Sequence, residues 1–215
     1  MTYLDVVNRI LKRLRERTVG TVNQTQYSTL IGIFVNDAKT AVEEAWRWTA
    51  LRSTLTAVTT PGIFNYELNG AKNNFLVLDV INDTENISMQ YRDTYWFNRV
   101  FKLATPQSGA PVYYNFNGVS SDGDTQVDLY PIPDAAYDIR FNLILRTPML
   151  TDDSARIEVP AHPIELLAYA MAVEERGEDG GFNPVTAYAM ANRALSDAVA
   201  LDSAQHPEEV TWVAP

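Results

Sequence analysis

The chain has 215 residues, of which 46% are hydrophobic and 20% are charged, a composition typical of folded globular proteins and not of disordered ones. This length suffices for one sizeable core or a compact body with one insertion, and no apolar run approaches the roughly 20 residues that span a bilayer. The absence of cysteine excludes disulfides, thiol nucleophiles and cysteine metal clusters, and fits folding in a reducing cytosol.

Charge is distributed unevenly along the chain. Residues 1–17 have a net charge of +3 and the remainder has −13, which gives the total of −10. An acidic body repels nucleic acid, so DNA binding in the usual sense is not expected, although DNA could pass nearby without adhering. An acidic surface with one basic segment also suits subunits that pack through opposite charges.

The first elements in chain order are two predicted helices. Residues 3–16 predict a helix with Thr2 as its N-cap and Asp5 as the capping-box partner. A second helix, from Tyr27 or Ser28 to about Trp48, should pack antiparallel on the first.

The basic face of the first helix includes Arg9 and Arg13. Three interpretations are open for it: a solvated face, a contact with a partner or another subunit, and a contact with passing DNA. Trp46 and Trp48, at the end of the second helix, suit either an interface anchor or a seal over the core.

From residue 51 to residue 146 the hydrophobic period changes to two. The alternation predicts six to eight strands, linked mostly by short turns, in an antiparallel sheet or small sandwich inserted between helices. The Pro61-Gly62 and Asn69-Gly70 turn signals predict that the strands before and after them form a hairpin or meander. Residues 87–91 predict one further strand.

Asp122-Gly123-Asp124 lacks the later glycine and the terminal glutamate of a calcium loop, so we interpret it as a hairpin turn.

A short aromatic helix interrupts the strands. Asp93 can cap a helix over residues 94–103 that contains Trp96. This helix has more aromatic side chains than a solvent-exposed helix without contacts would have. It should therefore either cover one face of the sheet or bind a partner.

Two helices are expected after the strands. One runs over residues 164–176 after Pro160, and an alanine-rich one starts with Asn183-Pro184 and ends near Ser203. Residues 204–215 form a tail with a lone tryptophan, Trp212. This side chain should either enter a pocket of a partner or pack back on its own subunit.

The sequence offers no recognisable reacting group. His162 and His206 are far apart, and neither has a second ligand at a zinc-site spacing. Glycine-rich phosphate loops and the nucleophile-elbow motif are missing from the sequence. Glu174 and Glu175 are adjacent on a helix, so their side chains project in different directions and do not form a catalytic pair. They indicate a solvent-exposed end of the helix. We therefore expect no catalytic residue, no metal and no cofactor.

Taken together, the elements predict an α+β fold. The expected organisation is a helical bundle from residues 1–50 and 157–203, an inserted antiparallel β domain at 51–156, and a C-terminal tail at 204–215.

The order of elements resembles one known family. A helical hairpin ending in Trp46-Arg47-Trp48, a β insertion, the runs at residues 127–134, 137–141 and 147–153, and two final helices are similar to the head-to-tail adaptor proteins of tailed bacteriophages, including tail tubular protein A of short-tailed phages. The resemblance implies a structural role: a ring of twelve copies beneath the portal protein, joined to the tail nozzle or next tail ring, with DNA passing through its lumen. It also implies a virion protein of the neck or tail, made in the bacterial cytoplasm and not bound to a membrane.

The sequence shows candidate contact residues but no catalytic group. We therefore take six side chains as candidates for partner or subunit contacts. They are Arg9, Arg13, Trp46, Trp48, Trp96 and Trp212.

Two alternatives belong to other classes of protein. One is a β-rich receptor- or carbohydrate-binding module that uses the aromatic residues Tyr91, Tyr95, Trp96, Tyr113 and Tyr114. The other is a hydrolase with unrecognised acidic residues, for which loss of activity on mutating Glu174 or Asp152 would be the supporting observation.

Overall fold

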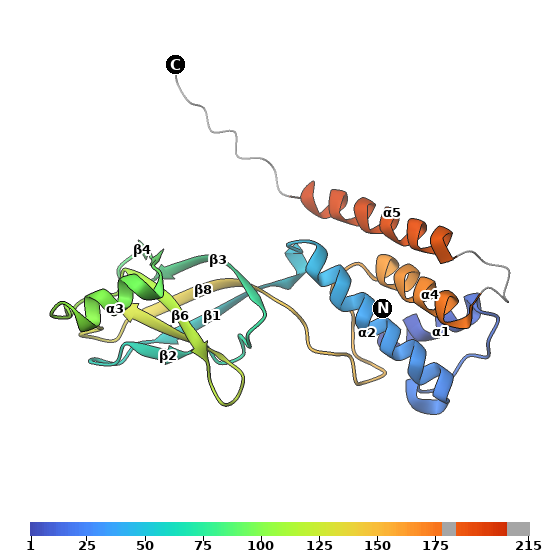
Figure 1. The fold of residues 1–215 in the computed structure, drawn as a ribbon, viewed down its shortest axis with the longest axis horizontal. Coiled ribbons are helices and arrows are strands. Elements are labelled where there is room, and N and C mark those ends of the chain that lie inside the picture. Colours follow the sequence, from blue (N-terminus) through green and yellow to red (C-terminus); the bar gives the residue numbers. More distant parts are fainter. Residues whose placement is uncertain (178–183, 206–215) are drawn as a thin grey trace, which may run out of the picture. The chain divides into compact units, whose positions relative to one another are not determined.

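The structure, a computed structural model, describes residues 1–177 and 184–205 and has an α+β fold with five α-helices in these ranges (Figure 1). The chain separates into two compact units. The helical unit contains residues 1–51 and the chain from residue 147 onward, and the β unit contains Arg52–Arg146.

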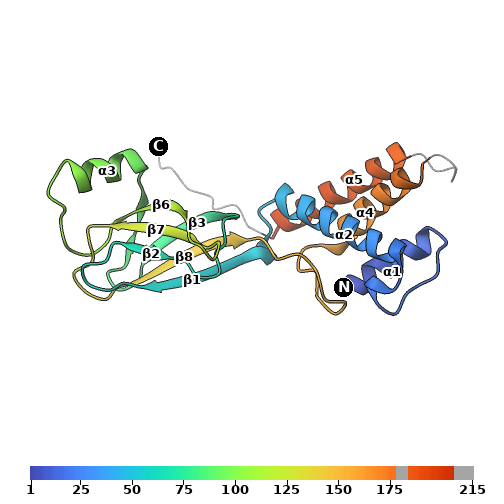
Figure 2. The same ribbon diagram turned by 60° about the horizontal axis from the view of Figure 1, so that its bottom comes forward.

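Four helices form the helical unit, and each packs on at least one other. Helix α4 contacts α1, α2 and α5, and α1 also contacts α2. Figure 2 shows α5 running alongside α4. The helices are α1 (Tyr3–Arg13), α2 (Gln26–Ala45), α4 (Ala161–Arg176) and α5 (Pro184–Ser203), with the short 3-10 helices η1 (Val22–Gln24) and η2 (Thr49–Leu51).

Helix α1 has the predicted N-terminus but ends early. The Thr2 side chain accepts a hydrogen bond from the Asp5 backbone and the Asp5 carboxylate accepts one from the Thr2 backbone, so the predicted capping box is confirmed. The helix stops at Arg13, before the expected end at residue 16, because Arg15 adopts a left-handed conformation with φ 60°.

The bounds of the other helices also differ in part from the prediction. Helix α2 ends at Ala45, since Trp46 is already extended with φ −149° and ψ 162°, and Trp48 therefore lies beyond the helix. Helix α4 begins at Ala161, three residues before the predicted start. Helix α5 starts at Pro184 as predicted, while its expected cap Asn183 lies outside the described residues.

The segment from residue 147 to residue 156, which the sequence analysis assigned to the β domain, contacts the helices of its own unit. Lys39 is buried on α2 and its ammonium group donates to the carbonyls of Thr147 at 2.8 Å and Pro148 at 3.1 Å. Leu150 exchanges two hydrogen bonds with the side chain of Asn36, also on α2. The buried Lys39 and the half-buried Asn36 of α2 thus satisfy backbone groups of this segment.

The β unit has eight strands in two four-stranded sheets, in the orders β1-β8-β3-β4 and β2-β7-β6-β5. All pairs are antiparallel except β5 with β6. The strands are β1 (Arg52–Val58), β2 (Asn65–Glu67), β3 (Phe75–Asn82), β4 (Ile87–Ser88), β5 (Gln90–Tyr91), β6 (Tyr113–Val119), β7 (Thr125–Tyr130) and β8 (Asp138–Leu145).

Side chains from both sheets form the core of the β unit. Alternate residues of β8, namely Ile139, Phe141 and Leu143, are completely buried and meet Val127 and Leu129 from β7 of the other sheet. The period-two pattern thus places one face of each sheet inward, as in a sandwich.

Two predictions about the strands were wrong. Strands β1 and β2 do not form a hairpin across Pro61-Gly62, because β1 pairs with β8 and β2 pairs with β7 in the other sheet. Residues 87–91 are two short strands in different sheets, separated by the buried Met89. The chain crosses from one sheet to the other at this methionine.

Two local predictions in the β unit are confirmed. The turn at residues 120–124 joins β6 to β7 as a hairpin, with Ser120 and Asp124 bonded through their backbones. Helix α3 (Thr94–Lys102) begins after Asp93, whose carboxylate accepts the backbone N–H of Trp96 at 2.7 Å.

Candidate interaction surfaces

Arg9 and Arg13 both bind one carboxylate of the same unit. Glu165 on α4 is buried, and its two oxygens accept hydrogen bonds from Arg9 Nη1 at 3.1 Å and from Arg13 Nε at 2.8 Å. The buried acid therefore binds both cations, neutralises one of their two charges and fastens α1 to α4. Both arginine side chains remain about half exposed, so each can still contact solvent or another subunit.

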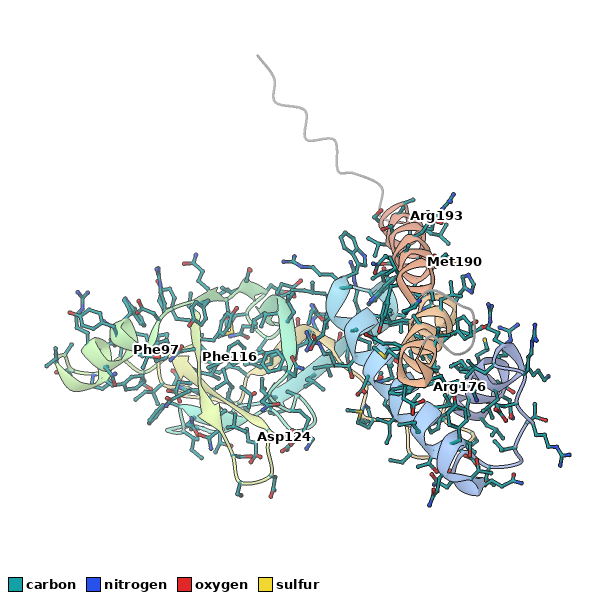
Figure 3. All side chains as sticks on the ribbon, turned by 45° about the vertical axis from the view of Figure 1, so that its right-hand side comes forward. Phe97, Phe116, Asp124, Arg176, Met190 and Arg193 are labelled. Atoms are coloured by element: carbon teal, nitrogen blue, oxygen red, sulfur yellow. The ribbon has the colours of Figure 1, made fainter. Side chains whose placement is uncertain are left out.

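A second arginine site lies at the end of α4. The guanidinium of Arg176 donates to the hydroxyl of Tyr27 at 2.6 Å and to a carboxylate oxygen of Glu16 at 2.6 Å. It also lies 4.6 Å above the centre of the Tyr27 ring, and Figure 3 labels it on α4. These contacts tie the C-terminus of α4 to both the α1–α2 connection and α2, so this arginine is engaged within the subunit.

Trp46 and Trp48 have different environments despite their proximity in sequence. Trp48 is completely buried and its indole N–H donates to the carbonyl of Val42 at 2.7 Å, which fits the core role considered above. Trp46 is 36% exposed, and its indole N–H donates to Asp202 of α5 at 2.9 Å. About a third of Trp46 is thus accessible to a neighbour while its indole N–H is satisfied.

The aromatic side chains of α3 mostly pack on the second sheet. The Trp96 ring lies 5.0 Å from that of Tyr113 and 5.4 Å from that of Tyr130, and Phe97 is buried beside it. Helix α3 therefore covers a sheet, one of the two roles predicted for it. Tyr95 points away and is 75% exposed.

These positions disfavour the carbohydrate-binding alternative. Tyr114 is buried in the core between the sheets, whereas Tyr91 and Tyr95 are exposed. The five aromatic residues proposed for that module therefore do not share one open platform of the kind on which sugars stack.

An apolar groove lies between α4 and α5, with a volume of about 460 Å³. Leu166 lines it and is buried, whereas the lining residues Met190 and Leu201 are each more than half exposed. Sequence analysis missed the groove because the spacing of apolar residues does not reveal which of them a neighbouring helix leaves uncovered. The remaining lining residues are Pro160, His162, Pro163, Arg193, Ala194, Asp197 and Ala198.

Two predicted residues cannot be placed. Trp212 and His206 lie outside the described residues. Within residues 1–177 and 184–205, no group of three or more histidine or acidic side chains is arranged to hold a metal ion. No helix in these ranges combines the length and apolar character needed to cross a membrane.

Exposed apolar side chains that border a groove are typical of proteins that contact other macromolecules. Comparison with family models supplies the particular class: the model of the SU10 adaptor protein family matches residues 1–211, and the chain belongs to this family. No curated protein matches the chain. The predicted resemblance to phage adaptor proteins is confirmed, and the chain has the structural role of a virion protein at the neck or tail.

Proposed function

We propose that this chain forms a homo-oligomeric ring of twelve copies that joins the portal protein to the tail nozzle or to the next tail ring. The ring continues the DNA channel and carries out no reaction. The observation that carries this proposal is the family match, which extends over both structural units. Within the subunit, we propose that the helices at the two ends of the chain form one bundle and that the β unit is an insertion into it.

The charge of the chain supports passage of DNA without adhesion. The net charge is −10, and Arg9 and Arg13 on the basic face of α1 are both paired with Glu165. A lumen lined by such subunits repels the phosphate backbone, so DNA can slide through it.

Neighbours in a ring need two different surfaces that close by rotation. We propose Trp46 as a contact at such a surface, because it is 36% exposed and its indole N–H is held by Asp202. The half-exposed Arg9 and Arg13 are candidates for pairing with the acidic surface of the next subunit. Trp48 is buried in the helical unit and Trp96 packs on a sheet of the β unit, so we propose neither as a direct contact.

Assembly on the portal provides the test. The isolated chain should be monomeric or weakly associated, because a closed ring needs a template when its subunits adhere weakly. Mass photometry of the chain alone and with purified portal from the same virion should show a large complex only in the mixture. Large assemblies of the same mass with and without portal would contradict this model.

The tail at 204–215 is the proposed portal attachment. A chain lacking these residues should keep its fold, measured by circular dichroism, and should no longer sediment with portal. Unchanged co-sedimentation would reject this role.

A further inference from the structure

The groove between α4 and α5 extends to the C-terminal end of α5. Leu201 borders the groove, and Gln205 follows it by one helical turn. Figure 3 labels Met190 and Arg193, which line the groove from α5. The lining is mainly apolar, so an apolar segment of matching size would remove it from water.

We propose that this groove binds the chain's own C-terminal segment, residues 210–213, with Trp212 as the anchor. This segment reads Val-Thr-Trp-Val and is the apolar part of the last ten residues. Its composition matches the groove, where Leu166, Met190 and Leu201 offer aliphatic and thioether surface to an indole ring.

The length of the chain permits this contact. Trp212 follows Gln205 by seven residues, so an extended chain carries it up to about 24 Å from the end of α5. The distance along α5 from Gln205 back to Met190 is about 22 Å. Leu201 is only about 6 Å along α5 from Gln205, so the anchor reaches this end of the groove easily and reaches Met190 only at full extension.

Tethering favours the chain's own segment over that of a second copy. A ligand joined by a short linker that can span the distance has an effective concentration in the millimolar range, far above the concentration of free subunits in a dilute sample. Charge adds a smaller contribution. Glu208 and Glu209 precede the segment, and the exposed Arg193 at the edge of the groove can pair with one of them, whereas Asp197 at the same edge repels them.

The absence of cysteine makes a direct test possible. In an otherwise cysteine-free chain, the pair Ala198→Cys and Thr211→Cys places one thiol in the groove and one beside the anchor. The matched control is Ser196→Cys with Thr211→Cys, because Ser196 is exposed, lies about 3 Å from Ala198 along α5, and points about 160° away from it around the helix. The readout is the effective concentration of each thiol pair, measured against glutathione at low protein concentration and without portal.

The groove pair should form its intramolecular disulfide with an effective concentration about tenfold above the control, the factor that about 1.4 kcal/mol of docking provides. Adding Trp212→Ala should return the groove pair to the control value. Equal effective concentrations in the two pairs would overturn the proposal. So would disulfides that form between chains only, because the occupant would then be a second copy.

This inference stands apart from the ring model. The measurement uses the isolated chain, so its result does not depend on whether a portal is bound. If both proposals hold, the docked segment is the resting form of the portal attachment, and portal binding releases it from the groove.

Discussion

The carboxylate of Asp202 accepts a hydrogen bond from the indole N–H of Trp46 at 2.9 Å, across 156 residues of sequence. The same carboxylate oxygen accepts the backbone N–H and the hydroxyl of Thr49, each at 3.3 Å. One buried acid near the end of α5 therefore fixes the chain just after α2 and holds the exposed Trp46 ring in one orientation.

Removal of this acceptor should destabilise the helical unit. Asp202→Ala leaves several donors without their partner, at a cost of about 1–3 kcal/mol in the free energy of unfolding. Hydrogen exchange of α5 amides in native conditions reports this unit separately from the β unit. The control Asp197→Ala, at an exposed position of the same helix, should change the value by less than about 0.5 kcal/mol. Equal protection in both variants would show that the Asp202 contacts contribute nothing.

Arg9 and Arg13 should act as a coupled pair. Either arginine alone can compensate Glu165, so each single change to alanine should cost about 1 kcal/mol or less, given the exposure of the arginines. The double change leaves a buried carboxylate without a cation and should cost more than the sum of the two single changes, by about 1 kcal/mol. Urea denaturation of the four chains in this cycle gives the coupling, with Lys12→Ala as the control for an exposed cation on the same helix. Strict additivity would mean that Glu165 is not shared.

How much of this was predictable depends on the sequence separation of the partners. The Thr2–Asp5 capping box and the Asp93 cap follow from patterns three residues long, and the structure contains both. The partnership of Arg13 with Glu165 joins residues 152 positions apart, and no local pattern specifies it. A hint was present, because Glu165 interrupts the apolar run of α4 on its buried face, where an acid needs a cation.

Strand pairing was also only partly predictable, because local patterns do not specify partners that are remote in sequence. Turn signals at Pro61-Gly62 describe a reversal of direction but not the strand with which the chain then pairs. Strand β8 lies between β1 and β3 in its sheet, and that choice is made by packing between the two sheets. Because both pairings are remote in sequence, local alternation predicted the strands but not their neighbours.

The stability of the helical unit should fall at high pH through Tyr188. Burial and the hydrogen bond to Glu174 raise the pKa of Tyr188 from 10.0 to about 12. The folded chain then keeps a proton that the unfolded chain loses, so this contribution is complete below pH 10 and disappears as the pH approaches 12. Hydrogen exchange of α5 at two pH values, corrected for the intrinsic rates, should show a smaller loss of protection in Tyr188→Phe than in the parent chain. Identical losses would exclude Tyr188 as the origin.

Trp96 and Tyr95 offer a matched pair of neighbours on α3. Trp96→Ala removes a ring packed on Tyr113 and Tyr130, and should lower the free energy of unfolding of the β unit by about 2–4 kcal/mol. Tyr95→Ala removes an exposed ring and should change it by less than about 0.5 kcal/mol. Thermal unfolding followed by near-ultraviolet circular dichroism separates these outcomes. A similar small effect in both would mean that α3 does not cover the sheet.

Electron microscopy of the virion that contains this chain tests the central claim most directly. A gold label on an affinity tag at the N-terminus of the chain should appear at the junction between capsid and tail, and symmetry averaging there should resolve a ring of twelve subunits around the DNA channel. Label on the tail tip or fibres, with no ring of this chain at the junction, would contradict the account.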